Sequence, residues 1–438
     1  MGKYYKWFLL LLLSGAFFFH QADRALFGLL TLPIQNELGL DDVQIGWINT
    51  VLSWTLAAMA FIAGPVGDRF PRKWVITISL MSWSVMTVMM GFVGEWHVLG
   101  FVLPAFFVVM FFRSIATGVG ESFYGPCYPP LIANYHKETL SVALSIHQGS
   151  LYFGLMTSGL IVAKALGLLG NWRNVFIAFG AAGFLLGVSF IFLLKDGGTH
   201  ETQGTHGTNG THGTQVAEKP GLLAGYKAFF TNPSAILAMC GFIAIVFVNN
   251  AYLFWAPKFM AVKFMSDMPM KEAVAQAGSA TMLWHHLFAF GAIMAGAVVT
   301  DRFVKRFPRF RLGFQITALL LGAPCLAIVG FSSSAAMMIV MSALYGVFRG
   351  FFEVNTHASL FDVMDPRFRS TSVGIFTLFA FFFGGLSGVL MGWLSDEYGV
   401  RGFEVGFGIM GATYVIGAVL MMISFLWTFS RDRLRTEN

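Results

Sequence analysis

Six ionisable residues stand within apolar stretches of this 438-residue chain, and their types and spacing suggest proton and anion chemistry. They are Asp23 and Arg24 in "GAFFFHQADRALFGLL" (15–30), Arg113 and Glu121 in "FRSIATGVGESFYGP" (112–126), and the pair Arg349 and Glu353. A charged group in hydrocarbon is costly unless it faces a cavity or a partner, so such residues are functional candidates. A buried carboxyl group can gain and lose a proton, and a buried arginine can bind an anion.

Asp23 and Glu121 are the candidates for proton coupling. Burial disfavours the charged form of a carboxyl group, whereas a neighbouring arginine favours it. If such a group meets water first from one side and then from the other, proton loading becomes coupled to a conformational change. The alternative is a permanent ion pair, in which Asp23 or Glu121 faces Arg24 or Arg113 and holds two helices together.

Several polar residues stand in otherwise apolar segments and could line a binding cavity. Amides, imidazoles and aromatic faces together suit a polyhydroxylated or carboxylated solute, although each alone is often a helix–helix hydrogen bond. Arg349 and Glu353, four residues apart, could equally form an intrahelical pair. The substrate-binding candidates are Arg24, Arg113, His147, Gln148, Asn249, Asn250, Tyr252, Trp255, Arg349 and Glu353, with His285, His286, Asn355 and His357 in similar settings.

The elements that position these residues are predicted to be membrane-spanning helices. Of the residues, 56% are hydrophobic and 11% are charged, against about 25% charged in soluble domains. A chain crossing lipid must be helical because its backbone finds no water there. A signal peptide is the alternative for the first span. Twelve spans are predicted, near 7–34, 43–67, 75–93, 97–124, 140–166, 172–194, 234–262, 277–300, 311–331, 335–358, 370–394 and 403–428.

The charge distribution predicts an orientation in which both termini lie in the cytoplasm. With this placement nineteen of the 28 Lys and Arg residues fall inside, six fall outside, and Arg24, Arg113 and Arg349 remain within spans. Such asymmetry is the expected positive-inside pattern, and it explains the net charge of +6 without nucleic acid. The three cysteines are scattered and match no zinc or disulfide pattern.

A polar stretch rich in Gly and Thr separates the sixth and seventh spans. The predicted organisation is a six-helix bundle over 1–195, a cytoplasmic linker over 196–232 and a second six-helix bundle over 233–438. His200, His206 and His212 recur every six residues in the linker. They could bind a metal, but a solvated repeat is the preferred interpretation, and no metal or cofactor is predicted.

Two loops recur in the two halves at almost the same offset. "GPVGDRFPRKW" (64–74) and "AGAVVTDRFVKRFPRF" (295–310) share Asp-Arg-Phe units 233 residues apart, and "LIANYHKETLS" (131–141) aligns with "LFDVMDPRFRS" (360–370) at an offset of 229. This spacing indicates a duplicated six-helix unit, and parallel halves of this kind are known among transporters.

On these residues the chain resembles the major facilitator superfamily over nearly its full length. The loop signature is carried by Gly64, Asp68, Arg69, Arg72 and Lys73, and a degenerate copy includes Asp301, Arg302, Lys305 and Arg306. The resemblance implies an all-α membrane protein of twelve helices in two pseudo-symmetric bundles. It also implies that this loop is a conformational latch between the halves, where the alternative is a simple positive anchor.

Within that family, the Asp-Arg pair of the first helix, the Gly-x-Gly-Glu of the fourth, and "LIANYH" are similar to the Spinster branch. The organic anion and sugar-acid symporters are the rival branch, and both resemblances imply that Asp23 and Glu121 are the protonatable pair. One departure concerns Arg113, which precedes Glu121 by eight residues rather than the usual seven. On an α-helix the extra residue turns a side chain by about 100°, so Arg113 is expected to face another direction.

The expected function is proton-coupled secondary active transport of a small organic anion or acidic sugar by alternating access. A Spinster-like lipid or lysolipid transporter is the alternative, and a receptor without transport is a third reading. No phosphate-binding loop occurs, and Ser145 and His147 point away from each other on a helix, so no enzyme is predicted. The expected partners are a small-molecule substrate, protons and the lipid bilayer of a bacterial inner membrane, with a monomeric chain and no nucleic acid.

Overall fold

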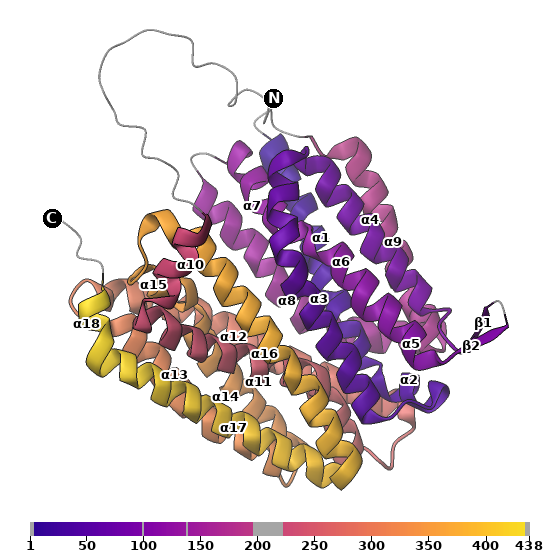
Figure 1. Cartoon of the computed structure of the whole chain (residues 1–438). Helices are drawn as coiled ribbons and strands as arrows, with labels where there is room; N and C mark the ends of the chain where they lie inside the picture. The colour runs from indigo at the N-terminus through magenta and orange to yellow at the C-terminus, as the bar shows by residue number, and fades with distance from the viewer. Residues whose placement is uncertain (1–3, 99, 137–138, 196–221, 434–438) are drawn as a thin grey trace.

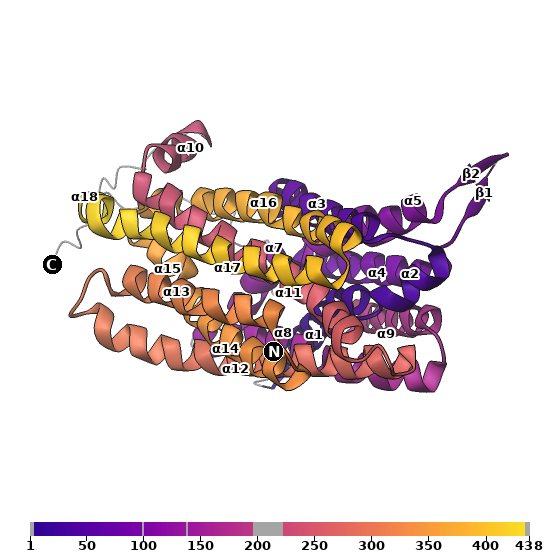
Figure 2. The same cartoon turned by 90° about the horizontal axis from the view of Figure 1, so that it is seen from below.

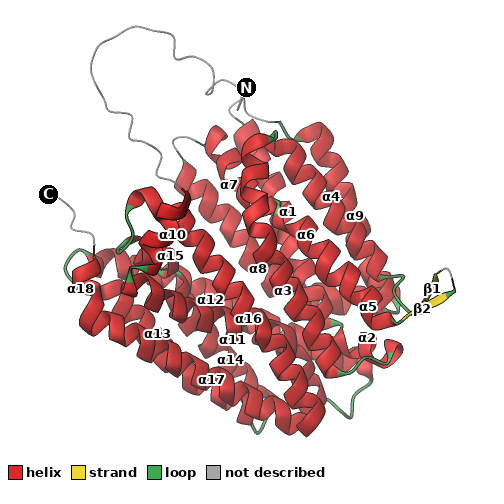
Figure 3. Ribbon diagram, in the orientation of Figure 1, coloured by secondary structure: helices red, strands yellow, loops and turns green. Residues whose placement is uncertain are grey.

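The computed structural model describes residues 4–98, 100–136, 139–195 and 222–433. The side chains of Gly64 and Asp68 are outside this description, as are those of Phe61, Ser141, Leu222, Leu223 and Ser370. Most of the predicted linker, with His200, His206 and His212, also lies outside the described residues. Helices make up nearly all of what is described (Figure 3).

The helices divide into a first set before residue 196 and a second set after residue 221. We call these the first half and the second half. The first half contains α1 (Tyr5–Leu29), α2 (Thr31–Leu38), α3 (Asp42–Arg69), α4 (Arg72–Met90), β1 (Trp96–Val98), β2 (Phe101–Leu103), α5 (Ala105–Val109), a π-helical segment (Met110–Ala116), α6 (Thr117–Ser122), α7 (Tyr124–Tyr135), α8 (Leu140–Leu169) and α9 (Trp172–Leu193).

The second half follows the same alternation of long helices and short connections. It contains α10 (Leu222–Phe230), α11 (Pro233–Phe264), α12 (Met270–Val304), α13 (Phe310–Phe331), α14 (Ala335–Glu353), α15 (Thr356–Phe361), a 3-10 turn (Pro366–Phe368), α16 (Arg369–Tyr398), α17 (Val400–Ile423), a π-helical segment (Ser424–Thr428) and α18 (Phe429–Asp432). Helix α10 lies within the region predicted as the linker.

The predicted class, an all-α membrane protein, is confirmed. Ten helical stretches of the described residues are long and apolar enough to cross a membrane. Helices α1 and α3, with 25 and 28 residues, fall outside that set of ten but are long enough to span, because a rise of about 1.5 Å per residue carries them past the roughly 30 Å hydrocarbon thickness.

The predicted start of the fourth span, at residue 97, is wrong. Residues Trp96–Val98 and Phe101–Leu103 instead pair as a two-stranded antiparallel hairpin, with Gly100 at φ 84° in the turn. The hairpin projects from the bundle (Figure 2). Pro104 caps the helix that follows, and proline suits a helix start because it lacks the N–H that an interior position requires.

Side-chain caps fix the starts of several long helices. Asp41 accepts a hydrogen bond from the Gln44 amide at 2.7 Å, and the Gln44 side chain accepts one from the Asp41 amide at 3.1 Å. Asn171, Asn232 and Ser334 cap α9, α11 and α14 in the same manner. Each cap satisfies amides that have no partner within the helix.

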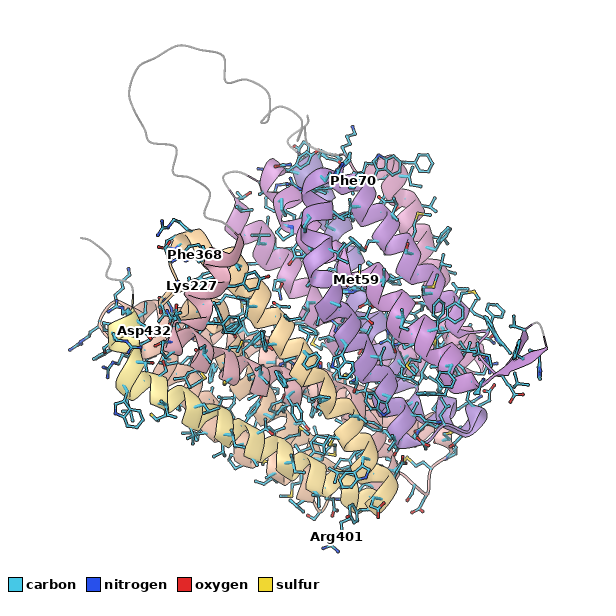
Figure 4. The ribbon with its side chains drawn as sticks, viewed as in Figure 1. Met59, Phe70, Lys227, Phe368, Arg401 and Asp432 are labelled. Carbon is cyan, nitrogen blue, oxygen red and sulfur yellow. The ribbon has the colours of Figure 1, made fainter. Side chains whose placement is uncertain are left out.

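The two ends of the molecule can be told apart in Figure 4. Phe70, Lys227, Phe368 and Asp432 lie toward one end, which we call the terminal end because α18, the last helix, lies there, and Arg401 lies at the other, distal end. Figure 1 shows α3 of the first half beside α16 of the second near the distal end, and the two helices diverge toward the terminal end.

Close helix crossings hold the halves together at the distal end and in the middle. A Cβ at Gly46 would lie 2.5 Å from the Gly388 carbonyl oxygen, and one at Gly159 would lie 2.3 Å from that of Gly278. Nearer the centre, Thr50 donates to the Gly385 carbonyl at 2.7 Å. Only residues without a bulky side chain permit backbones to approach so closely.

Candidate proton and substrate site

The structure brings four of the predicted ionisable residues together inside the first half. Asp23 and Arg24 come from α1, Arg113 from the π-helical segment and Glu121 from α6. Asp23, Arg113 and Glu121 retain only 6%, 4% and 3% of their exposure. Two buried carboxyl groups and two arginines therefore share one region, as the spacing suggested.

Glu121 lies beside a histidine and an arginine of α1 but makes no well-oriented hydrogen bond with the described residues. Its Oε2 lies 3.2 Å from Nε2 of His20 and 3.8 Å from Nε of Arg24. Neither carboxylate oxygen of Glu121 has a hydrogen-bond partner among the described residues. A buried carboxylate without donors is costly when ionised, so a proton can be accepted here without breaking a hydrogen bond.

Asp23 is held differently. The Thr87 hydroxyl on α4 lies 3.0 Å from Oδ1 and 3.1 Å from Oδ2 of Asp23, and it also lies 3.1 Å from the Trp83 carbonyl oxygen. A hydroxyl can donate to a charged carboxylate or accept from a neutral one by rotating. Thr87 therefore suits either protonation state of Asp23.

The eight-residue spacing led us to expect another direction for Arg113, and the structure shows its side chain directed toward α1. The extra residue is absorbed by the π-helical segment Met110–Ala116, in which the wider turn takes one residue more than an α-turn. One NH₂ group of Arg113 donates to the Arg24 carbonyl at 3.0 Å, and its guanidinium lies 5.6 Å from the Phe27 ring centre. Arg113 is thus turned toward α1 and lies within electrostatic range of both Asp23 and Glu121.

Two glycines next to Glu121 allow this packing. A Cβ at Gly118 would lie 2.9 Å from the Thr55 side chain on α3, and one at Gly120 would lie 3.0 Å from the Trp83 amide on α4. The Gly120 carbonyl accepts a hydrogen bond from Ser79 at 2.6 Å. These glycines therefore allow α3 and α4 to approach α6 closely.

A second polar cluster joins the two halves. Nε of Arg349 donates to Oε1 of Glu353 at 2.9 Å, as the spacing of four allowed, and Tyr152 of the first half donates to Oε2 of the same carboxylate. Another nitrogen of Arg349 lies 3.0 Å from Nε2 of His285. Glu353 is therefore the acceptor that links an arginine of one half to a tyrosine of the other.

This second cluster opens into a cavity of about 410 Å³ between the halves. Its polar lining includes Ser145, Gln148, Tyr152, Arg349, Glu353, Thr356 and His357, and its apolar lining includes Leu151, Phe242, Phe290 and Met294. Small-molecule sites combine an apolar wall with a few placed polar groups in this way. Among the substrate candidates, Gln148, Arg349 and Glu353 line this cavity.

Other predicted substrate residues lie outside the lining of this cavity. His147 is fully buried, stacks on Tyr128 with ring centres 3.9 Å apart, and lies 3.1 Å from the Tyr124 hydroxyl. Tyr252 and Trp255 are packed within the second half, where Tyr252 donates to the Thr281 carbonyl at 3.2 Å. These three side chains have the packing contacts of core residues.

The remaining candidates include one that contacts the opposite half. Asn250 of α11 donates to the Ser53 hydroxyl of α3 at 3.4 Å, whereas Asn249 is only partly buried. No group of three His, Cys, Asp or Glu side chains within the described ranges could hold a metal ion.

At the distal end a buried ion pair joins the halves, and this pairing was not predicted. Lys258, one of the six cations assigned to the outer side, lies within α11 and donates to Asp42 of α3 and, at 2.7 Å, to Gln35. Gln35 and Ser395 each donate to Asp42 at 2.5 Å. Asp42 and Lys258 are 6% and 9% exposed, so the pair is largely removed from water.

Asp396 of α16 completes this distal contact by capping α3 of the opposite half. Its two carboxylate oxygens accept hydrogen bonds from the Asp42 amide at 3.0 Å and the Val43 amide at 2.7 Å. An acid is favourable at a helix N-terminus because the amides and the helix dipole are positive there. We call Gln35, Asp42, Lys258, Ser395 and Asp396 the distal latch.

The predicted latch at the terminal end looks different. Arg69, Asp301 and Arg302 are exposed and make no ion pair with any described side chain. Arg72 and Lys73 begin α4, and Lys73 donates to the Ile191 carbonyl at 2.7 Å. The side chains of Gly64 and Asp68 lie outside the described residues.

Sequence reasoning missed Thr87, Tyr152, Lys258, Asp42 and Asp396. Thr87 and Tyr152 are ordinary residues of apolar helices, and nothing local distinguishes them. The other three gave a usable signal, since each is a charged residue close to the predicted end of a span. The sequence did not indicate which of these charged residues contact each other, because the contacting residues lie 216 residues or more apart.

Comparison with known proteins agrees with this architecture. The Major Facilitator Superfamily model matches residues 12–322 and 303–437. The probable galactarate/D-glucarate transporter of Bacillus subtilis (strain 168) is 22% identical over 448 residues, which cover 99% of this chain and 94% of that protein. Protein spinster of Drosophila melanogaster is 24% identical over 339 residues, or 74% of this chain and 51% of that protein, so the match spans about half of its length.

The fold also matches a solved structure over its full length. A bacterial homolog of the human lysosomal transporter Spinster, in an inward-facing and occupied conformation, aligns with a TM-score of 0.79 at 18% identity and covers 100% of both chains. The chain is thus a multi-pass secondary transporter that belongs to the major facilitator superfamily.

Proposed function

We propose that this protein couples proton movement to the transport of a small organic anion or acidic sugar by alternating access. The observation that carries the proposal is Glu121, a buried carboxyl group that lies beside His20 and Arg24 and has no well-oriented hydrogen bond from any described residue. The Arg24 side chain is 24% exposed whereas that of Glu121 is 1% exposed. Arg24 therefore stands between the buried acid and its more open surroundings.

In the proposed cycle Asp23 and Glu121 exchange protons when the halves rock. Protonation of either group removes a buried negative charge and weakens its attraction to Arg24 and Arg113. This change in charge biases the equilibrium between the two arrangements of the halves, and the cavity between the halves is thereby coupled to the proton. The intact distal latch supports an arrangement closed at the distal end.

The cavity beside Arg349 is the proposed site for the solute. Arginine suits carboxylates because its planar fork of donors matches two oxygen atoms. Gln148, Tyr152 and His357 add donors and acceptors for hydroxyl groups, and Phe242 adds an apolar wall. The likeness to a probable galactarate/D-glucarate transporter supports this class of substrate.

The experiment is uptake into proteoliposomes driven by an imposed pH gradient, with sugar acids as test solutes. Glu121→Gln and Asp23→Asn should each abolish gradient-driven accumulation while leaving exchange of substrate across the membrane at least partly intact. Glu95→Gln, at an exposed carboxylate of the hairpin, is the matched control and should behave as the unmodified protein. Normal accumulation in both cluster variants would remove these acids from the proton path.

A lipid or lysolipid substrate is the second candidate. The aromatic and thioether groups of Phe242, Phe290 and Met294 on the cavity wall could contact an acyl chain, and the Spinster likeness supports it. A thermal-shift screen against sugar acids, neutral sugars and lysolipids separates the two candidate substrate classes, because a ligand stabilises the state to which it binds.

We further propose that the chain is a monomer in a bacterial inner membrane, with both termini in the cytoplasm.

A further inference from the structure

A groove of about 710 Å³ on the second half, away from the cavity between the halves, has two walls with a regular spacing. One wall is the face of α13 that carries Phe310, Gly313, Phe314 and Thr317. These positions follow the i, i+3, i+4, i+7 spacing that places residues on one side of a helix. The groove therefore runs along α13 from its first turn into the membrane-spanning part.

The facing wall comes from the end of the last span. Phe425, Phe429 and Arg433 recur every four residues from the π-helical segment Ser424–Thr428 through α18. Gly313 lets the two walls approach each other closely, because even a Cβ there would lie 3.3 Å from the Phe425 ring. The result is an aromatic channel about as large as a typical small-molecule site.

Positive charge stands at one end of this channel only. Arg309 and Arg433 line it at the terminal end, where Arg309 donates to the Ser430 hydroxyl and lies 5.4 Å from the Phe425 ring centre. The nearby acid, Asp432, is already engaged by Arg431 at 2.8 Å and by the Ser234 hydroxyl at 2.8 Å. The opening of the groove thus offers cations whose charge no acid of the lining cancels.

We propose that this groove binds a phospholipid with an anionic headgroup from the leaflet at the terminal end. The headgroup phosphate contacts Arg309 and Arg433, and one acyl chain lies between Phe314 and Phe425. Basic pockets between helices at the membrane surface recognise acidic headgroups in this way. A lipid fits this groove better than a soluble anion does, because the cationic opening continues into the apolar channel below it.

A second groove in the same molecule provides an internal comparison. The groove of about 750 Å³ between α3, α4 and α6 is lined by apolar residues such as Phe70, Trp74 and Phe111, and its lining contains no charged residue. It can accept acyl chains of any lipid without distinguishing headgroups. Selectivity for an anionic lipid is therefore assigned to the α13 groove alone.

The test measures the binding of phosphatidylglycerol and phosphatidylcholine with identical chains to the purified, delipidated full-length protein by native mass spectrometry. Phosphatidylglycerol should bind more tightly. The double variant Arg309→Gln/Arg433→Gln should weaken its binding by about 30-fold, because each arginine near a membrane surface contributes about a factor of five. Lys305→Gln, an exposed cation of the same loop that does not line the groove, should leave the preference unchanged.

Two further measurements distinguish binding of a whole lipid in the groove from binding of its headgroup alone. Thr317→Phe fills the channel one turn below Gly313 and should weaken the phosphatidylglycerol complex while both arginines remain. Glycerol 3-phosphate, which has no acyl chain, should not compete at concentrations near the Kd of the lipid. Equal binding of the two lipids, an unchanged preference in the double variant, or full competition by glycerol 3-phosphate would each overturn the proposal.

Discussion

Removing the positive partner of the distal latch should open the distal end of the molecule. In Lys258→Met the Asp42 carboxylate stays buried but loses its only cationic partner among the described residues, keeping the donors Gln35 and Ser395. Leaving one charge of a buried pair uncompensated costs about 3–5 kcal/mol. Because two donors remain, we take the lower end, about 3 kcal/mol.

This cost applies only while the distal end is closed, since Asp42 is hydrated once the halves separate there. The equilibrium between the closed and open distal end should therefore shift by about 100-fold toward the open form. The amides of Asp42 and Val43, which donate to Asp396 of the other half, report this opening directly. Their hydrogen–deuterium exchange, followed by mass spectrometry of peptides that span the start of α3, should accelerate by a similar factor.

Two controls define what this experiment measures. Asp42→Asn/Lys258→Met removes both charges and should restore most of the protection, because replacing a whole buried pair is often close to neutral. Lys271→Met removes an exposed lysine near the same end and should have no effect. If exchange at Asp42 and Val43 in Lys258→Met stays within threefold of the unmodified protein, the ion pair does not hold the halves together and the reasoning fails.

Three further predictions concern the inner site and the contact between the halves. Thr87→Val removes the hydroxyl that contacts Asp23, so the pH at which uptake is half-maximal should shift. The free energy of unfolding, followed by thermal unfolding, should change by no more than about 1.5 kcal/mol. Deleting Ile115, an exposed residue of the π-helical segment, should give a regular α-helix with the usual spacing of seven, keep the direction of Arg113 and leave uptake close to that of the unmodified protein; a loss of uptake would show that the π-turn itself has a role. Gly159→Leu places a side chain where a Cβ already lies 2.3 Å from the backbone of α12, so it should disrupt packing of the halves, and a melting temperature unchanged from the unmodified protein would contradict this.

Much of the fold could be predicted from the sequence because the signals are local. Apolar runs long enough to cross a bilayer identify helices whatever their neighbours are, and the repeated Asp-Arg-Phe loops indicated two related halves. The prediction failed where composition misleads. Residues 96–98 and 101–103 are mostly apolar, yet they form the strands β1 and β2 before Pro104 caps the next helix.

The sequence predicted which residues belong to the candidate site, but not how their side chains are oriented. An acid or arginine in an apolar run is conspicuous, so Asp23, Arg113, Glu121 and Arg349 could be selected from sequence alone. The direction of Arg113 could not, because one inserted residue can be taken up either by rotation or by a π-turn, and packing against α1 decides between them.

Tertiary structure alone decided which charges meet. Tyr152 and Glu353 come together across 201 residues, and Asp42 and Lys258 across 216. No local pattern specifies such pairs, because they depend on how helices of separate halves cross at small residues such as Gly46 and Gly159. The sequence by itself determined the number of spans and the presence of buried charge, whereas the crossing of the helices determined its partners.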